Sequence, residues 1–322
     1  MPSTGSADAV LLESDGGAIA DAYHLGADAV LEGPVARGEV GQVWRLTTSL
    51  GTWAVKEPFE APSAAEVLDD AAFQDKVVAS GVVMPEVVRT PGGDVLADVG
   101  SAVVRVYTWL DLCARDPWLD PATVGRIVAS IHSVRYIGDN PVDPWYTDPV
   151  GGDRWDDLIR GLGAEDAPFT DALLDYRDEL VALESLLEEP THLQTCHRDL
   201  FADNVLRTGD GSVATIDWEN SGLADPSQEL GLVLLDFGRG DSARARKLYE
   251  TYVDAGGPGR IDRPSNFSMV IAQIAHIGEI SCARWLDPDR RDQREHNTGR
   301  VEEFLTERVT RRTIDDLVRA VT

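Results

Sequence analysis

Acidic and amide side chains gather in one short stretch, His197-Arg198-Asp199-Leu200-Phe201-Ala202-Asp203-Asn204. Asp199 and Asn204 lie five positions apart, and Asp217 follows a short β-like run beyond a turn at Gly209-Asp210-Gly211. Two carboxylates and an amide that converge on one point suit phosphoryl transfer from ATP. One carboxylate orients and deprotonates the acceptor hydroxyl, while the other two groups hold Mg²⁺ across the phosphates. The spacing therefore predicts Asp199 as the catalytic base and Asn204 and Asp217 as metal ligands.

A purely structural role is the alternative, with Asp199 and Asn204 forming turns and Asp217 capping a strand end. The order of these residues, however, resembles the catalytic loop H-x-D-x-x-x-x-N of the protein-kinase-like superfamily, with Asp217 in the place of the Asp of D-F-G. The chain departs from protein kinases after Asp217, because Trp218-Glu219 replaces Phe-Gly and no A-P-E segment follows. It is more similar to the aminoglycoside phosphotransferase family and its maltokinase-like and choline-kinase-like relatives, which read H-G-D-x-x-x-x-N and then I-D-W-E.

A lysine at the end of a predicted strand supports this resemblance. The chain has only three lysines, and Trp53-Ala54-Val55-Lys56 is similar to the V-A-I-K strand, whose lysine reaches the α- and β-phosphates. The resemblance implies that an acid on the following helix pairs with Lys56. Glu66 and Asp70 lie one turn apart on that helix; family spacing favours Asp70 and side-chain reach favours Glu66, so both remain open.

Two further segments are candidates for nucleotide binding. Arg37 to Val43 occupies the turn between the first two predicted strands and keeps two of the three glycines of G-x-G-x-x-G. The backbone amides near Gly38 and Gly41 are therefore expected to contact the β- and γ-phosphates, although an ordinary hairpin would look similar. The run that ends in Val106 and Tyr107 closes the predicted sheet, and its backbone is expected to read the adenine edge. An edge strand would give the same pattern.

The acceptor side is less constrained. Gln273, His276 and Glu279 recur every third residue in a predicted helix, and such a stripe can simply face solvent. In the family that the chain resembles, this late helix lines the substrate cleft, which makes Glu279 a candidate ligand for a hydroxyl or ammonium group. Trp218-Glu219-Asn220 is a second candidate: Trp218 either stacks on a sugar ring or packs in the core, and Glu219 or Asn220 binds polar substituents.

Three segments together, Ala54 to Glu60, Gln194 to Leu206 and Ile216 to Asn220, resemble the actinobacterial glucosamine kinases, which are maltokinase-like. The resemblance implies ATP-dependent phosphorylation of the primary hydroxyl of glucosamine, with ATP and Mg²⁺ as cofactors. An aminoglycoside antibiotic phosphotransferase, or a kinase of another sugar or amino alcohol, would use the same residues. A regulatory pseudokinase is the non-enzymatic alternative, and the intact set of catalytic residues argues against it.

Short β-rich pieces should position Lys56. From Leu31 to Lys56 they predict three antiparallel strands, with breaks at Gly33-Pro34, Gly38, Gly41 and Ser49-Leu50-Gly51. A helix is predicted over 63–80, and further strands over 82–88 and 95–110. Residues 1–30 are expected to form a cap with a short helix at 18–24, and residues 31–108 a β-rich nucleotide-binding lobe.

Helical patterns dominate the expected second lobe, residues 109–322, which would carry the catalytic loop and the acceptor site. The fold class is therefore predicted to be α+β, a bilobal protein-kinase-like fold. β-like runs cover 191–196 and 213–217, and the predicted helices cover 121–134, 155–162, 169–187, 227–239, 242–255, 266–285 and 302–321.

Charge and composition exclude other classes of partner. The chain of 322 residues has 56 acidic and 29 basic side chains, a net charge of −27. Such a surface repels nucleic acids and anionic membranes. The three widely spaced cysteines predict buried, reduced thiols, and no signal peptide or apolar run long enough to span a bilayer is evident. We therefore expect a cytoplasmic monomer whose partners are ATP and a small amino sugar.

Overall fold

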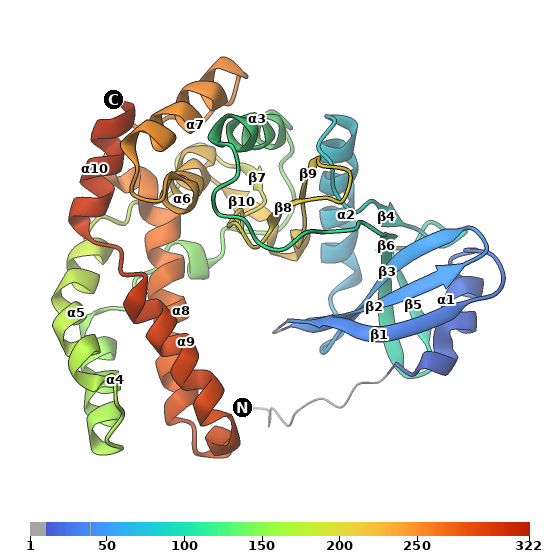
Figure 1. Ribbon diagram of the computed structural model, residues 1–322, viewed down its shortest axis with the longest axis horizontal. Coiled ribbons are helices and arrows are strands. Elements are labelled where there is room, and N and C mark those ends of the chain that lie inside the picture. Colours follow the sequence, from blue (N-terminus) through green and yellow to red (C-terminus); the bar gives the residue numbers. More distant parts are fainter. Residues whose placement is uncertain (1–10, 39) are drawn as a thin grey trace. The chain divides into compact units, whose positions relative to one another are not determined.

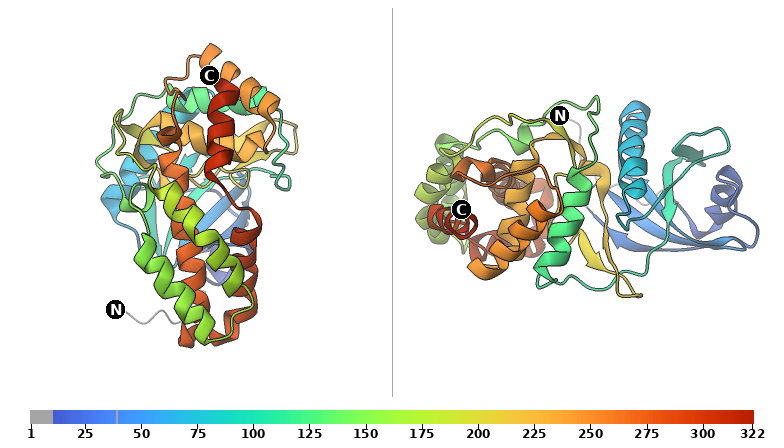
Figure 2. Two further views of the ribbon diagram at one scale, coloured as in Figure 1. Left: turned by 90° about the vertical axis from the view of Figure 1, so that its left-hand side faces the viewer. Right: turned by 90° about the horizontal axis from the view of Figure 1, so that it is seen from above.

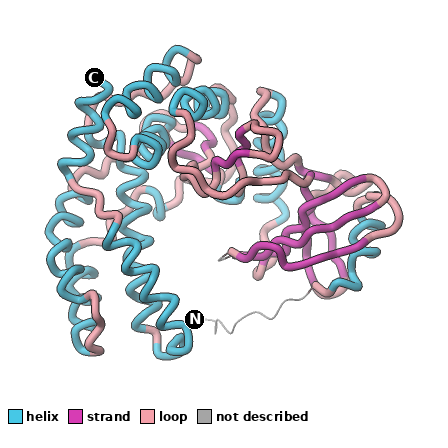
Figure 3. Tube along the Cα trace, viewed as in Figure 1, coloured by secondary structure: helices cyan, strands magenta, loops and turns pink. Residues whose placement is uncertain are grey.

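The computed structural model describes residues 11–38 and 40–322, and the chain falls into two compact units. The first unit takes the described residues through Arg115, together with Gly138–Asn140 and Asn204–Glu219. The second unit takes Asp116–Ile137, Pro141–Asp203 and Asn220–Thr322. Strands dominate the first unit and helices the second (Figure 3). The predicted α+β class is confirmed, while the segment 204–219 groups with the N-terminal unit although it lies far along the chain.

An antiparallel sheet of six strands forms the centre of the first unit (Figure 1). Its strand order is β1-β2-β3-β6-β4, and β5 also pairs with β6. The break predicted at Gly33-Pro34 does not end β1, but the pairing with β2 is interrupted there, with a register shift between Glu32 and Ala36. The strand bounds are β1 Val30–Arg37, β2 Gly41–Thr48, β3 Gly51–Pro58, β4 Val87–Val88, β5 Leu96–Val99 and β6 Ala102–Thr108.

One face of this sheet is apolar. The helix α1 (Gly16–Ala22), after a short 3-10 helix at Glu13–Asp15, packs there in a cluster that contains Val55, Val104 and Val106. Because successive side chains of a strand point to opposite faces, the residues between these valines point to the other face. Lys56 of β3 and Arg105 of β6, which are partners in the strand register, therefore share that second face.

The helix α2 (Ala64–Ala79) follows β3 and packs through Val67 and Ala71 against Val95. It occupies the position predicted for a helix at 63–80. A Ser63 N-cap position and the left-handed Gly81 after its last turn mark its ends.

Eight helices of the described chain belong to the second unit. The side view in Figure 2 shows α4 and α5 beside α8 and α9, which share one core around Trp155, Tyr176 and Trp285. Short 3-10 helices of this unit lie at Pro144–Tyr146, Pro264–Phe267 and Pro288–Gln293, and another, Trp218–Asn220, begins in the first unit and ends in the second. The helices are α3 Pro121–His132, α4 Gly152–Ala164, α5 Thr170–Glu184, α6 Pro226–Gly238, α7 Ser242–Asp254, α8 Ser268–Leu286, α9 Arg294–Thr306 and α10 Arg311–Val321.

The single helix predicted over 302–321 is wrong, because two helices share this span. α9 ends at Thr306, and Thr310 caps α10 by accepting a hydrogen bond from the amide of Thr313. Between them, Val309 exchanges hydrogen bonds with the hydroxyl of Tyr176 on α5, at 2.6 and 3.0 Å. This tertiary contact, which local periodicity does not contain, fixes the break.

Two short strand pairs flank the residues singled out in the sequence. β8 (Val205–Arg207) pairs with β9 (Val213–Thr215) in the first unit. β7 (Gln194–Cys196) pairs with β10 (Gly222–Ala224) in the second. β7 and β9 occupy predicted positions, whereas β8 and β10 were not predicted. Among the helices that the structure describes, none is long and apolar enough to cross a membrane.

Candidate functional site

The β8–β9 hairpin brings the backbones of Asn204 and Asp217 together in the first unit. Val205 pairs with Thr215, and the amide of Ile216 donates to the carbonyl of Asn204 at 3.0 Å. The two predicted metal ligands thus stand at the open end of one hairpin. Their donors are an amide oxygen and a carboxylate, the oxygen ligands that Mg²⁺ prefers, so the residues present fit this ion.

Asp217 has a left-handed backbone, with φ at 64°, which is rare for a residue with a side chain. Such a conformation costs about 1–2 kcal/mol and persists where surrounding structure holds it, often at functional positions. The carboxylate is 44% exposed, so it remains open to a ligand from solvent.

Lys56 forms two ion pairs with this segment. Its Nζ lies 2.7 Å from Oδ1 of Asp217 and 2.7 Å from Oε2 of Glu219. The expected partner on α2 is therefore a wrong prediction: the acids that pair with Lys56 come from the chain after β9. Glu66 is exposed in the first turn of α2, and the charge of Asp70 acts on Arg105, whose pKa it helps to raise.

Glu219 is contacted by more than one donor. Besides Lys56, Nη1 of Arg105 lies 4.0 Å from Oε1, and the hydroxyl of Tyr107 donates to the same oxygen at 3.4 Å. Burial alone would raise the pKa of Glu219, but the charges of Lys56 and Arg105 hold it well below its usual range. Burial and the neighbouring Glu219 raise the pKa of Asp217 in turn. The sequence predicted Glu219 as a substrate ligand, whereas here it is an internal counter-ion.

Trp218 lies in the core of the first unit. It is 3% exposed, its ring meets Phe73 edge to face at 5.8 Å, and its Nε1 donates to the carbonyl of Thr215. Of the two alternatives drawn from the sequence, the structure favours packing, because no exposed ring face is left for a sugar.

The glycine turn connects β1 and β2, and Glu39 lies outside the described residues. The amide of Gly38 donates to the carbonyl of Gly41 at 2.9 Å. A side chain at Gly41 would place its Cβ 2.7 Å from the carbonyl oxygen of Glu57, so the close approach of β3 requires glycine there. The contact of these glycines with phosphate stays a prediction.

Val106 and Tyr107 do not match their expected role. Both belong to β6, and at these positions β6 pairs with β3 on one side and with β4 on the other. Their backbone groups are therefore used within the sheet, and the edge strand considered from the sequence is also excluded.

In the second unit, Arg198 has a left-handed backbone, with φ at 65°. Its amide donates to Oε1 of Glu229 on α6, and its carbonyl accepts from Nε2 of Gln273 on α8 at 2.9 Å. Two helices thus fix the peptide groups on either side of one residue. This explains how a residue with a side chain keeps a conformation that glycine adopts more easily.

The side chain of Arg198 binds the backbone that follows the first unit's last residue. Its Nε donates to the carbonyl of Asn220 at 2.6 Å, and its Nη2 to that of Ser221 at 3.3 Å. The guanidinium also lies 4.4 Å from the ring centre of Tyr146. Arg198, which precedes the predicted base Asp199, thus holds the two residues just before β10.

Asp199 is half-buried and accepts a hydrogen bond from Asn220, whose Nδ2 lies 3.1 Å from its Oδ2. Asn220 was predicted as a substrate ligand, and the structure gives its amide a contact with the predicted base instead. This hydrogen bond restricts the rotation of the carboxylate and fixes which oxygen faces elsewhere.

A buried pair of polar residues, His132 and Glu229, holds the Arg198–Asp199 segment, because Glu229 accepts from the amide of Arg198. This pair was missed in the sequence. His132 and Glu229 are fully buried, and Nε2 of His132 lies 2.6 Å from Oε2 of Glu229, with the hydroxyl of Tyr252 2.8 Å from Nδ1. Burial alone would raise the pKa of Glu229, but its hydrogen bond with His132 holds that pKa below its usual value. The Asp225-Pro226 N-cap before Glu229 was the available signal.

Cys196 lies beside this group, and its ligating atom is close enough to those of His132 and Glu229 for a three-residue metal cluster. Burial raises the pKa of Cys196 well above its usual range, so the thiol stays protonated and is a poor metal ligand. Cys282 is buried as well, but Cys113 is exposed, which corrects the prediction of three buried thiols.

The polar stripe on α8 is engaged within the second unit. Gln273 holds the carbonyl of Arg198, and the ring of His276 stacks on Trp145 at 5.0 Å. Glu279 accepts two hydrogen bonds from Arg154 of α4, of which the Nε bond is 2.8 Å long. The stripe does not simply face solvent, and Glu279 would have to exchange Arg154 for a substrate group.

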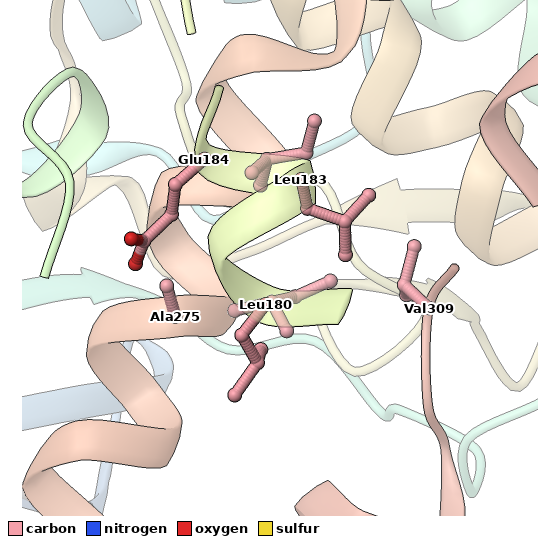
Figure 4. A pocket seen from close by; sticks show the side chains of 7 residues that line it. Leu180, Leu183, Glu184, Ala275 and Val309 are labelled. Carbon is pink, nitrogen blue, oxygen red and sulfur yellow. The ribbon is translucent and has the colours of Figure 1, made fainter. Parts of the chain in front are cut away.

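A pocket between α5 and α8 is too small for a sugar. Leu180, Leu183, Glu184, Ala275 and Val309 line it, with two isoleucines (Figure 4). It has room for about one water molecule. Glu184 is occupied by the amides of Val150 and Gly151 and by the indole of Trp155.

Comparisons with known proteins agree with this geometry. The aminoglycoside phosphotransferase of Alicyclobacillus acidocaldarius is 18% identical at a TM-score of 0.59, covering 97% of this chain and 99% of that one. A spectinomycin phosphotransferase solved with ADP and spectinomycin is 12% identical at 0.66, covering 93% and 98%. A choline/ethanolamine kinase family protein of Mesorhizobium loti is 19% identical at 0.57, covering 96% and 99%.

At these identities the likeness shows the fold alone, and it confirms the protein-kinase-like architecture. A search of curated protein sequences finds no significant match. A profile described as the phosphotransferase enzyme family, however, matches residues 33–263, well over half of the chain. The chain therefore belongs to the phosphotransferase enzyme family.

Proposed function

We propose that this protein transfers the γ-phosphoryl group of ATP to a hydroxyl of a small amino sugar, and that glucosamine is the acceptor to test first. The observation that carries the proposal is the pairing of Lys56 with Asp217 beside Asn204. The lysine proposed for the phosphates and the two proposed metal ligands thus belong to one unit. Asp199 precedes Asn204 by five residues on the same loop, as the reaction requires.

In this mechanism Lys56 binds the triphosphate, and Asn204 and Asp217 hold Mg²⁺. The ion would neutralise charge on the phosphates as the γ-phosphoryl group leaves. Asp199 aligns the acceptor hydroxyl and takes its proton, and the hydrogen bond from Asn220 keeps its carboxylate in one orientation. His197 is fully buried, which suits a bracing role in the loop better than chemistry. Most of the rate enhancement then comes from positioning and charge neutralisation.

The choice of acceptor rests on the three segments that resemble glucosamine kinases. Glu279 offers a carboxylate for an ammonium group if Arg154 moves aside. An aminoglycoside would need to place a larger polycation at the same residues, and choline would present its hydroxyl beside a quaternary ammonium. These alternatives differ in the shape of the acceptor site and share the catalytic residues.

An acceptor screen tests the proposal. ATP consumption is measured with glucosamine, neutral sugars, aminoglycosides and choline, and the phosphate position of any product is determined by NMR. Glucosamine 6-phosphate as the main product supports the assignment. Faster turnover of an aminoglycoside or choline would replace glucosamine as the acceptor, and no turnover with any acceptor would contradict a kinase.

A further inference from the structure

We infer that Glu219 is the positioning residue that holds Lys56 in place for the triphosphate, the part that the sequence assigned to an acid on α2. The inference rests on the proposed function, because it concerns the lysine that would bind ATP. It also reassigns Glu219, which the sequence predicted as an acceptor ligand.

The two oxygens of Glu219 face different donors. Oε2 pairs with Lys56, while Oε1 faces the hydroxyl of Tyr107 and the guanidinium of Arg105. Lys56 and Arg105 lie opposite each other in the register of β3 and β6, and Tyr107 stands two residues beyond Arg105 on the same face. The sheet therefore anchors one side of the carboxylate and leaves the other side for the lysine.

The buried guanidinium of Arg105 helps to keep the Glu219 carboxylate in its position. Its side chain is 3% exposed, and its Nε and Nη2 have no hydrogen-bond partner among the described residues. A buried guanidinium with so few partners depends on nearby negative charge. Glu219 supplies such charge together with Asp70, and its contact with Arg105 at 4.0 Å does not involve Lys56.

Asp217 cannot serve as the lasting partner of Lys56. In the proposed function its carboxylate binds Mg²⁺. The charge of the ion then weakens the attraction between this carboxylate and the ammonium of Lys56. Glu219 is two residues away and is turned into the sheet. With Glu219 in place, Lys56 can leave Asp217 and still have a counter-ion.

This arrangement predicts what loss of Glu219 does. Without it, Asp217 is the remaining ion-pair partner of Lys56 among the described residues, and the ammonium competes with the metal for one carboxylate. Acceptor binding should not change, because both oxygens of Glu219 face internal donors.

The test measures binding of AMP-PNP to the full chain by calorimetry over a range of Mg²⁺ concentrations, which needs no turnover. In Glu219→Gln we expect the Mg²⁺ concentration at half-saturation to rise about tenfold. Glu219→Asp, which keeps the charge, should lie between wild type and Glu219→Gln. Glu66→Gln is the matched control on α2 and should behave as wild type.

A double-mutant cycle isolates the route through Lys56. In a Lys56→Met background, Glu219→Gln should produce no further shift, because the ammonium that it positions is gone. Thermal melts show whether each variant is folded. If Glu219→Gln does not fold, the Mg²⁺ dependence of Glu219→Asp is compared with that of wild type instead.

Unchanged Mg²⁺ dependence in folded Glu219→Gln would overturn the inference, as would a full shift that persists in the Lys56→Met background. A rise confined to the acceptor KM would restore the acceptor role. Failure of the proposed function looks different: wild-type protein would then bind no AMP-PNP with Mg²⁺ at all.

Discussion

The Lys56 cluster and the Arg198–Asp199 segment are held in different ways. In the first, charged side chains hold one another: Lys56 pairs with Asp217 and Glu219, and Arg105 stands behind them. In the second, peptide groups are held, since Glu229 and Gln273 bind the two sides of Arg198. A region built from mutual charges can exchange partners when a ligand arrives, whereas a region built on fixed peptide groups keeps one geometry.

The largest effect should come from the fixed region. Asp199→Ala removes the predicted base, so turnover should fall about a thousandfold, while AMP-PNP binding stays close to wild type. Single-turnover kinetics and calorimetry measure the two quantities. The neighbouring exposed Asp203→Ala serves as the control, with turnover near wild type. Equal turnover in Asp199→Ala and wild type would remove Asp199 from the mechanism.

Glu229→Gln should have the next largest effect, and it tests how much the buried charge of Glu229 contributes to the stability of the fold. It breaks a fully buried pair with His132, so the free energy of unfolding should fall by about 3 kcal/mol in denaturant titrations. Glu184→Gln is the matched control, since the donors to Glu184 are uncharged amides and an indole; its loss should be smaller. Equal losses would mean that the charge of Glu229 adds nothing.

The pKa of Glu229 also predicts how the stability difference between wild type and Glu229→Gln changes with pH. The pKa of Glu229 lies below its usual 4.5 in the folded state, so the unfolded chain binds more protons in acid. The stability that Glu229 contributes is therefore present above about pH 4.5 and lost as the pH falls through the lower folded value. The difference in free energy of unfolding between wild type and Glu229→Gln should therefore become smaller as the pH falls over that range. A difference that grows there would contradict the pairing of Glu229 with His132.

Asn220→Ala should have a moderate effect, because it releases one hydrogen bond to Asp199. We expect kcat to fall about tenfold with the KM for ATP unchanged. Steady-state kinetics with both substrates varied separate the alternatives. An acceptor KM that rises at constant kcat would make Asn220 a substrate ligand, as the sequence suggested.

The smallest effect is expected for Trp218→Phe, which keeps an aromatic ring against Phe73 but loses the hydrogen bond to Thr215. The free energy of unfolding should fall by about 1 kcal/mol, and the acceptor KM should not change. Thermal melts and acceptor kinetics test this pair of expectations. A large rise in the acceptor KM would return Trp218 to the substrate site.

Local patterns were sufficient for much of the fold. Strand breaks at glycines and helical periodicity predicted the sheet, α2 and most of the later helices. The spacing from Asp199 to Asn204 predicts a catalytic site, and that role stays a prediction. Periodicity failed near Thr310, because the hydroxyl of Tyr176, far away in sequence, binds the amide of Val309 between the end of α9 and the cap of α10. At Gly33-Pro34 the strand β1 continues, but its pairing with β2 is interrupted there, since the register shifts between Glu32 and Ala36.

The partners of the predicted site residues were harder to foresee. A family pattern places the partner of Lys56 on α2, but the strand register puts Arg105 beside Lys56 and so draws Glu219 to both. The contact between His132 and Glu229 joins residues 97 positions apart. Nothing in the spacing of such residues reveals their contact, since it depends on how whole helices pack.

Arg198 stands where the family pattern H-G-D has glycine, and its neighbour in space is Gly222. A Cβ on Gly222 would lie 2.5 Å from Cζ of Arg198. The guanidinium thus fills the volume that a side chain at position 222 would need, and the two positions share one space. Any larger residue at 222 calls for a smaller one at 198, so libraries that vary these positions one at a time will pass over combinations that only a paired change can reach.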